Sequence, residues 1–89
     1  MIFIHIDMLI ERRDRVINIC EIKYSSNEYE IEKDDDMNLR NKIGTFVRET
    51  KTKDSIQMTM ITTFGVRKNK FSGIVNNQVC MDDLFQNVE

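Results

Sequence analysis

The sequence predicts a small α/β (α+β) domain in which a β-hairpin is followed by one long helix and further strands. Two runs of large apolar and β-branched residues, 2–10 and 16–24, flank a short charged segment. An apolar stripe with helical spacing follows within residues 35–50, and a run rich in Met and Thr comes after it. The chain has 89 residues, so we expect a single domain over residues 1–89.

The two apolar runs, with the charged residues 11–15 between them, are typical of a β-hairpin. Directly opposed residues of an antiparallel pair project from the same face of the sheet. A register that pairs Asp7 with Glu21, or with its diagonal neighbour Ile19, therefore brings the two carboxylates together. A shift by one residue would separate them. Both faces of the second strand are largely apolar, which predicts a central strand that is covered on both sides.

The aspartates at 34–36 are expected to cap a helix over roughly residues 35–50. Its apolar stripe consists of Leu39, Ile43, Phe46 and Val47. Residues 56–66 predict a third strand. Residues 71–80 predict a last hairpin that turns at residues 76–77, and residues 82–85 a turn or short helical cap.

Composition limits the classes of function. The chain is 40% hydrophobic and 31% charged, which is typical of a globular protein, and its formal net charge is −2. Bulk charge therefore does not attract nucleic acid, and contact with DNA needs a local basic cluster or a metal-bridged phosphate. No stretch approaches the ~18 apolar residues of a membrane span. Two cysteines far apart in the sequence predict a reduced, cytoplasmic protein. We expect no small-molecule cofactor.

Two carboxylates and one ammonium group interrupt the apolar strands, namely those of Asp7, Glu21 and Lys23. Buried charges are costly unless they are paired or bind a metal. Two neighbouring carboxylates, with the backbone carbonyl of Ile22 as a third ligand, could hold Mg²⁺ or Mn²⁺. Lys23 could then position a water molecule or stabilise charge on a phosphate. The alternative is a structural salt bridge at the end of a strand.

The segments 6–10 (Ile-Asp-Met-Leu-Ile) and 20–25 (Cys-Glu-Ile-Lys-Tyr-Ser) resemble the second and third core strands of the PD-(D/E)xK, restriction-endonuclease-like superfamily. With residues 39–43, 48–53, 60–65, 72–75 and 82–85, the chain resembles the C-terminal nuclease-like domain of uncharacterised prokaryotic AAA-type ATPases. The resemblance implies that Asp7 and Glu21 bind the metal and that Lys23 is the catalytic lysine. It also implies that DNA is the substrate.

The superfamily core has the order αβββαβ, and this chain resembles it from the second strand onward. We therefore expect a truncated core, the C-terminal fragment of a larger protein, and a homodimer that covers the open sheet edge. Nucleases of this type often place phosphate-contacting bases on the following helix, where this chain has Arg40, Lys42 and Arg48; the alternative is a solvated helix face. The hypothesis is a metal-dependent nuclease domain, and the alternative is a non-catalytic dimerisation or interaction module.

Overall fold

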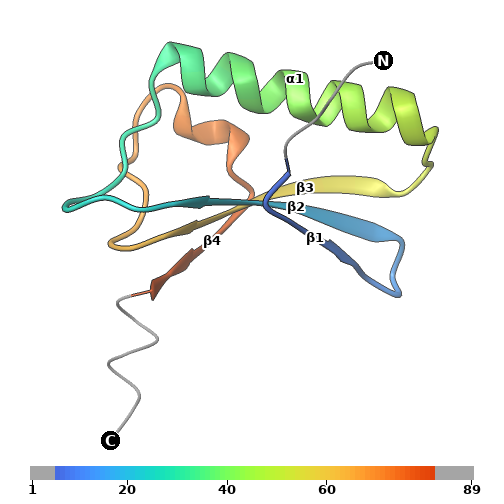
Figure 1. The fold of residues 1–89 in the computed structure, drawn as a ribbon, viewed down its shortest axis with the longest axis horizontal. Coiled ribbons are helices and arrows are strands. Elements are labelled where there is room, and N and C mark those ends of the chain that lie inside the picture. The colour runs from blue at the N-terminus through green and yellow to red at the C-terminus, as the bar shows by residue number, and fades with distance from the viewer. Residues whose placement is uncertain (1–5, 82–89) are drawn as a thin grey trace, which may run out of the picture.

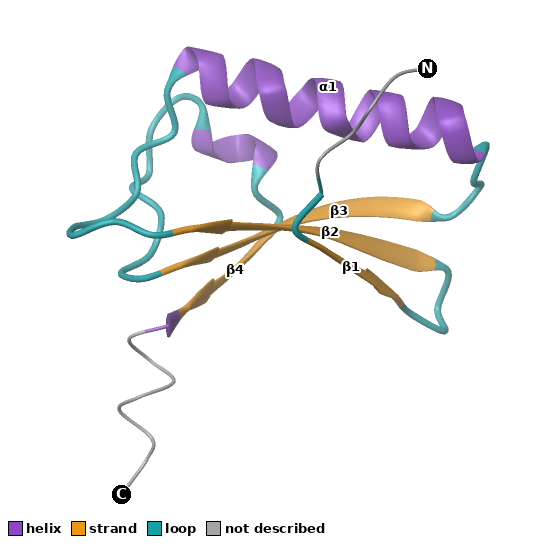
Figure 2. Cartoon of the chain, viewed as in Figure 1, coloured by secondary structure: helices purple, strands orange, loops and turns teal. Residues whose placement is uncertain are grey.

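A four-stranded mixed sheet carries one long helix on one of its faces (Figures 1 and 2). The structure is a computed structural model that describes residues 6–81. The elements in chain order are β1 (Met8–Glu11), β2 (Val16–Lys23), α1 (Lys33–Thr50), β3 (Ser55–Thr62), the 3₁₀ turn η1 (Ser72–Ile74) and β4 (Asn77–Cys80).

The strand order in the sheet is β1-β2-β3-β4. β1 and β2 form the predicted antiparallel hairpin, in which Met8 lies opposite Cys20 and Leu9 opposite Ile19. β3 runs parallel to β2, and α1 supplies the crossover that a parallel pair requires. The α+β class and the order hairpin, helix, strand are therefore confirmed.

The hairpin turn is tighter than the predicted loop over residues 11–15, because Glu11 belongs to β1. The amide of Arg12 donates to the carbonyl of Val16 at 2.8 Å, and Arg15 adopts a left-handed conformation with φ of 66°. The predicted first strand began at residue 2. In the structure β1 begins at Met8, and residues 2–5 of that prediction lie outside the described part of the chain.

Helix α1 begins two residues earlier than predicted, because Glu32 rather than an aspartate is its N-cap. Glu32 and Asp35 form a capping box, in which the amide of Glu32 donates to the Asp35 carboxylate at 3.0 Å. The helix ends at Thr50, and Lys51 follows in the left-handed conformation with φ of 54°.

The predicted final hairpin is wrong, because β4 runs parallel to β3 and the segment before it forms η1. Asn76 is an anchor rather than a turn residue. Its side-chain oxygen accepts from the amide of Met58 at 2.8 Å, and its own amide donates to the Met58 carbonyl at 2.9 Å. This pairing with β3 aligns residues 77–80 in the same direction. The predicted cap at residues 82–85 lies outside the described residues.

The core lies between the sheet and α1. Ile19, Leu39 and Met58 are fully or almost fully buried, and partly buried apolar residues pack around them: Ile6, Ile43, Phe46, Ile56 and Ile74. Three of the four residues of the predicted helical stripe thus face the core, whereas Val47 is exposed. The expected cover on both sides of β2 is not found in residues 6–81, because α1 and η1 lie on the same face of the sheet (Figure 1).

The cross-strand pair Leu9 and Ile19 provides a test of this core. Ile19 has no exposed surface, whereas Leu9 is 43% exposed. We expect Ile19→Ala to lower the free energy of unfolding by about 2–4 kcal/mol, because it leaves a cavity beneath α1. Leu9→Ala should cost about 1 kcal/mol or less. Urea denaturation followed by circular dichroism measures both, and equal losses would contradict this position of the core.

Candidate functional site

Asp7 lies one residue before the β1–β2 ladder, whose register would place it opposite Glu21. The chain bends at Asp7, and its carboxylate oxygen Oδ2 accepts a hydrogen bond from the backbone amide of Ile22 at 2.9 Å. This bond holds the Asp7 carboxylate at the β1 side of β2, next to the backbone of Glu21. The register is therefore the one that the sequence analysis required.

Glu21 is the only charged side chain that is buried among residues 6–81, with 1% of its surface exposed. Its oxygen Oε1 lies 2.6 Å from Nζ of Lys42, whose side chain is 22% exposed. β2 thus presents Glu21 to the side of the sheet that α1 covers, and α1 supplies the opposite charge. Such a pair offsets the desolvation of a carboxylate in the core.

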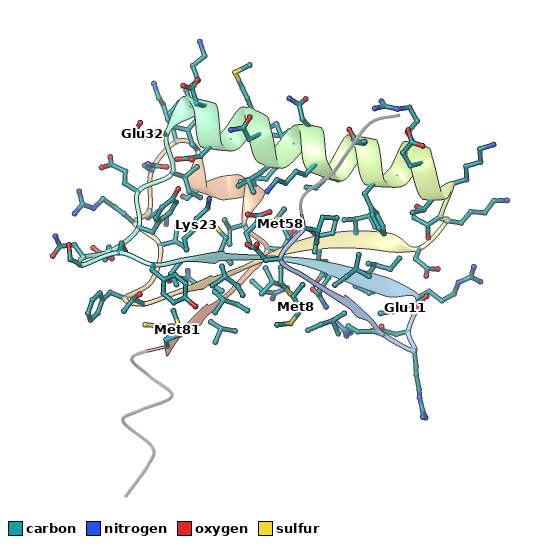
Figure 3. All side chains as sticks on the ribbon, viewed as in Figure 1. Met8, Glu11, Lys23, Glu32, Met58 and Met81 are labelled. Carbon is teal, nitrogen blue, oxygen red and sulfur yellow. The ribbon has the colours of Figure 1, made fainter. Side chains whose placement is uncertain are left out.

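Lys23 shares a face of β2 with Glu21, because side chains alternate along a strand. Figure 3 shows Lys23 on the side of the sheet that carries α1. Its side chain is half-buried, and it forms no ion pair with a carboxylate of residues 6–81. Its ammonium group is therefore not held by an acid of the described chain.

Tyr29 is a neighbour of this site that sequence analysis missed. Burial raises the pKa of its phenol to about 12, with further contributions from the charge of Asp35 and a hydrogen bond to it, and from the charges of Glu32 and Glu21. Tyr29 stands in a polar connection without periodicity, so its sequence context carries no signal of this position. Its location depends on the bridge between Tyr29 and Val66, which are distant in the sequence.

The three basic residues of α1 that were predicted to contact phosphate have different partners. Lys42 faces Glu21, whereas Arg40 pairs with Asp36 at 3.0 Å on the exposed side of α1. Arg48 donates to the hydroxyl of Thr45 at 3.3 Å. With about 100° of rotation per residue, Lys42 and Arg40 lie about 200° apart around the helix. The three side chains therefore do not form one basic surface, and their binding to nucleic acid stays a prediction.

The oxygen atoms that the sequence analysis predicts as metal ligands all belong to β2 or lie beside it, at one end of the strand. They comprise the carboxylate oxygens of Asp7 and Glu21 and the carbonyl oxygen of Ile22, which points to the same side of the strand as its amide. No group of three or more His, Cys, Asp or Glu residues that could hold a metal occurs within residues 6–81. Hard oxygen donors of this kind fit Mg²⁺ or Mn²⁺, with water filling the other positions.

Comparison of the chain with family models, with curated proteins and with solved structures gave no match. The resemblance to the PD-(D/E)xK superfamily therefore stays a prediction. Among residues 6–81, no helix is both long enough and apolar enough to cross a membrane.

The ion pair between Glu21 and Lys42 can be tested by stability. We expect Lys42→Met to lower the free energy of unfolding by about 2–4 kcal/mol, because it leaves a buried carboxylate without a counter-charge. The double variant Glu21→Gln with Lys42→Met should recover most of this loss. Arg40→Met is the matched control on the same helix, and loss of its exposed pair should cost about 1 kcal/mol or less. Equal effects of the two single substitutions in urea denaturation would contradict a buried pair.

Alkaline titration tests the surroundings of Tyr29. In a Tyr24→Phe background, phenolate absorbance should rise with a midpoint of about 12, and Asp35→Asn should lower this midpoint. The raised pKa means that the unfolded chain loses this proton first. The contribution of Tyr29 to stability is therefore complete below pH 10 and lost as the pH rises to about 12. Circular dichroism at each pH shows that the titrated state is folded, and a folded-state midpoint near 10 would contradict the structure.

Proposed function

We propose that this chain is a divalent-metal-dependent nuclease domain that cleaves DNA phosphodiester bonds, with a reaction centre of Asp7, Glu21 and Lys23. The observation that supports the proposal is the register of the hairpin, which brings Asp7 next to the backbone of Glu21 through the bond to the Ile22 amide. The resemblance to nuclease-like domains of AAA-type ATPases supports both the DNA substrate and an association with such an ATPase.

Asp7, Glu21 and the Ile22 carbonyl would hold Mg²⁺ or Mn²⁺. When bound, such an ion polarises the scissile phosphate and lowers the pKa of a bound water. Lys23 provides a cation on the same face as Glu21. Its ammonium group can donate to the attacking water or to a phosphate oxygen on which negative charge develops.

Lys42 is compatible with this centre. A carboxylate has two oxygens and about four lone-pair sites, so Glu21 can keep its bond to Lys42 and still offer an oxygen to a metal ion. Lys42 also reduces the net negative charge of the site. A DNA phosphate therefore meets less repulsion there than it would from two isolated carboxylates.

Metal binding tests the proposal directly. We expect calorimetry to detect Mn²⁺ binding with a dissociation constant in the low millimolar range or tighter, and Asp7→Asn to weaken it about tenfold or more by removing a charged ligand. Asp14→Asn is the matched control, because Asp14 is an exposed carboxylate in the hairpin turn that pairs with Arg12. In the presence of Mn²⁺, the wild-type protein should nick plasmid DNA and the Lys23→Ala variant should not.

Equal Mn²⁺ affinities of the wild-type protein and the Asp7→Asn variant would reject the metal site. A folded protein that binds no Mn²⁺ and cleaves no DNA would support the second candidate, a non-catalytic interaction module. The observation that favours this second candidate is the bond between Glu21 and Lys42, because it gives the buried carboxylate a structural partner without a metal.

A further inference from the structure

The sheet face opposite α1 is uncharged and partly apolar, and no element of residues 6–81 covers it (Figure 1). The strand register places apolar residues of all four strands on this face, including Met8, Ile10, Cys20, Ile22, Ile61 and Val79. Met8, Ile10 and Val79 are 42%, 45% and 38% exposed, Ile22 and Ile61 are half-buried, and Cys20 is 1% exposed. Figure 3 shows Met8 on this side of the sheet and Met58 on the other side, next to α1. We call this surface the open face.

The open face carries no charge. In a chain that is 31% charged, each residue that β1 to β4 place on this face is uncharged. Four of its polar side chains bind one another within the sheet. The hydroxyl of Thr59 donates to Asn18 at 3.2 Å, and the Asn77 amide donates to Gln57 at 2.8 Å. Burial of this face therefore leaves these hydrogen bonds intact and desolvates no ion.

We propose that the open face binds the open face of a second copy of this chain, and that the chain is a homodimer with its two sheets packed face to face. A two-fold interface requires a surface that is complementary to itself. An uncharged face meets this requirement, because two copies bring no like charges together. Two sheets packed in this way resemble the layers of a β-sandwich.

The chemistry of the open face excludes a nucleic acid as the occupant, because no cation lies on it to neutralise phosphate. The size of the face sets the strength of the dimer. Four strands spaced by ~4.8 Å, with about six residues of ~3.3 Å each, give a flat footprint of about 400 Å². Because side chains make the real surface larger than this flat footprint, two such faces together would bury on the order of 1,000 Å² of accessible surface. This area is at the low end for a specific complex. The dimer is therefore concentration-dependent.

Sedimentation velocity over a concentration series from about 1 to 500 µM tests the proposal, because weak complexes of this size dissociate within this range. The wild-type protein should change from monomer to dimer within the series. Ile10→Lys should raise the dissociation constant at least tenfold, because the ammonium group would be buried in an apolar interface.

Leu9→Lys is the matched control. Leu9 is 43% exposed and follows directly before Ile10 on β1, so its side chain points to the opposite face. This variant should dimerise like the wild type. Val79→Lys on β4 is the second disrupting variant, which preserves the test if Ile10→Lys does not fold. A wild-type protein that stays monomeric at all concentrations would overturn the proposal, and so would equal dissociation constants for the Ile10 and Leu9 variants. Metal binding is measured separately, so the nuclease proposal can fail without affecting this result.

Discussion

A carboxylate buried between a strand and a helix is the constraint on which the arrangement of this small domain depends. Glu21 would be costly at the centre of the sheet without a counter-charge, and Lys42 reaches it from α1. The bond limits the rotation of α1 above β2, because Lys42 must stay on the side of the helix that faces the sheet. Apolar packing of Ile19, Leu39 and Met58 alone would tolerate a range of helix positions. The pair therefore adds a directional constraint to the apolar packing of the helix.

The electrostatics around Glu21 decide what the site can bind. Asp35 and Glu32 at the start of α1 add negative charge near Tyr29, and Asp7 adds another carboxylate beside β2. The nearby cations are Lys42, which is engaged by Glu21, and Lys23. A phosphodiester approaching this end of β2 meets more acids than bases, so its binding requires additional positive charge. In the proposed site, a divalent ion held by Asp7 and Glu21 would supply that charge. The acidic surroundings and the nuclease proposal are thus consistent only if a metal is present.

Sequence analysis succeeded where the structural signal is local. The apolar run of β2, the charged hairpin turn and the helical stripe of Leu39, Ile43 and Phe46 each lie within one short segment, so the local pattern of residues predicts them. It failed where partners are distant in the sequence. The direction of β4 depends on the bonds between Asn76 and Met58, and the environment of Lys42 depends on a strand that ends 19 residues earlier. The helix begins earlier than predicted because Glu32 and Asp35 form a capping box. The three aspartates at 34–36 indicated a cap within their own run instead.

The two faces of the sheet have different chemistry, and this separates the two proposals. The face under α1 holds the buried charge and the ion pair, whereas the open face is uncharged and its hydrogen bonds are internal. Pairing of two open faces leaves both candidate sites outside the interface, on opposite sides of the dimer. The sites would then point away from each other, so each would engage its own phosphodiester rather than two positions of one duplex. Dimerisation through this face would therefore contribute stability, by covering apolar surface, rather than a composite active site.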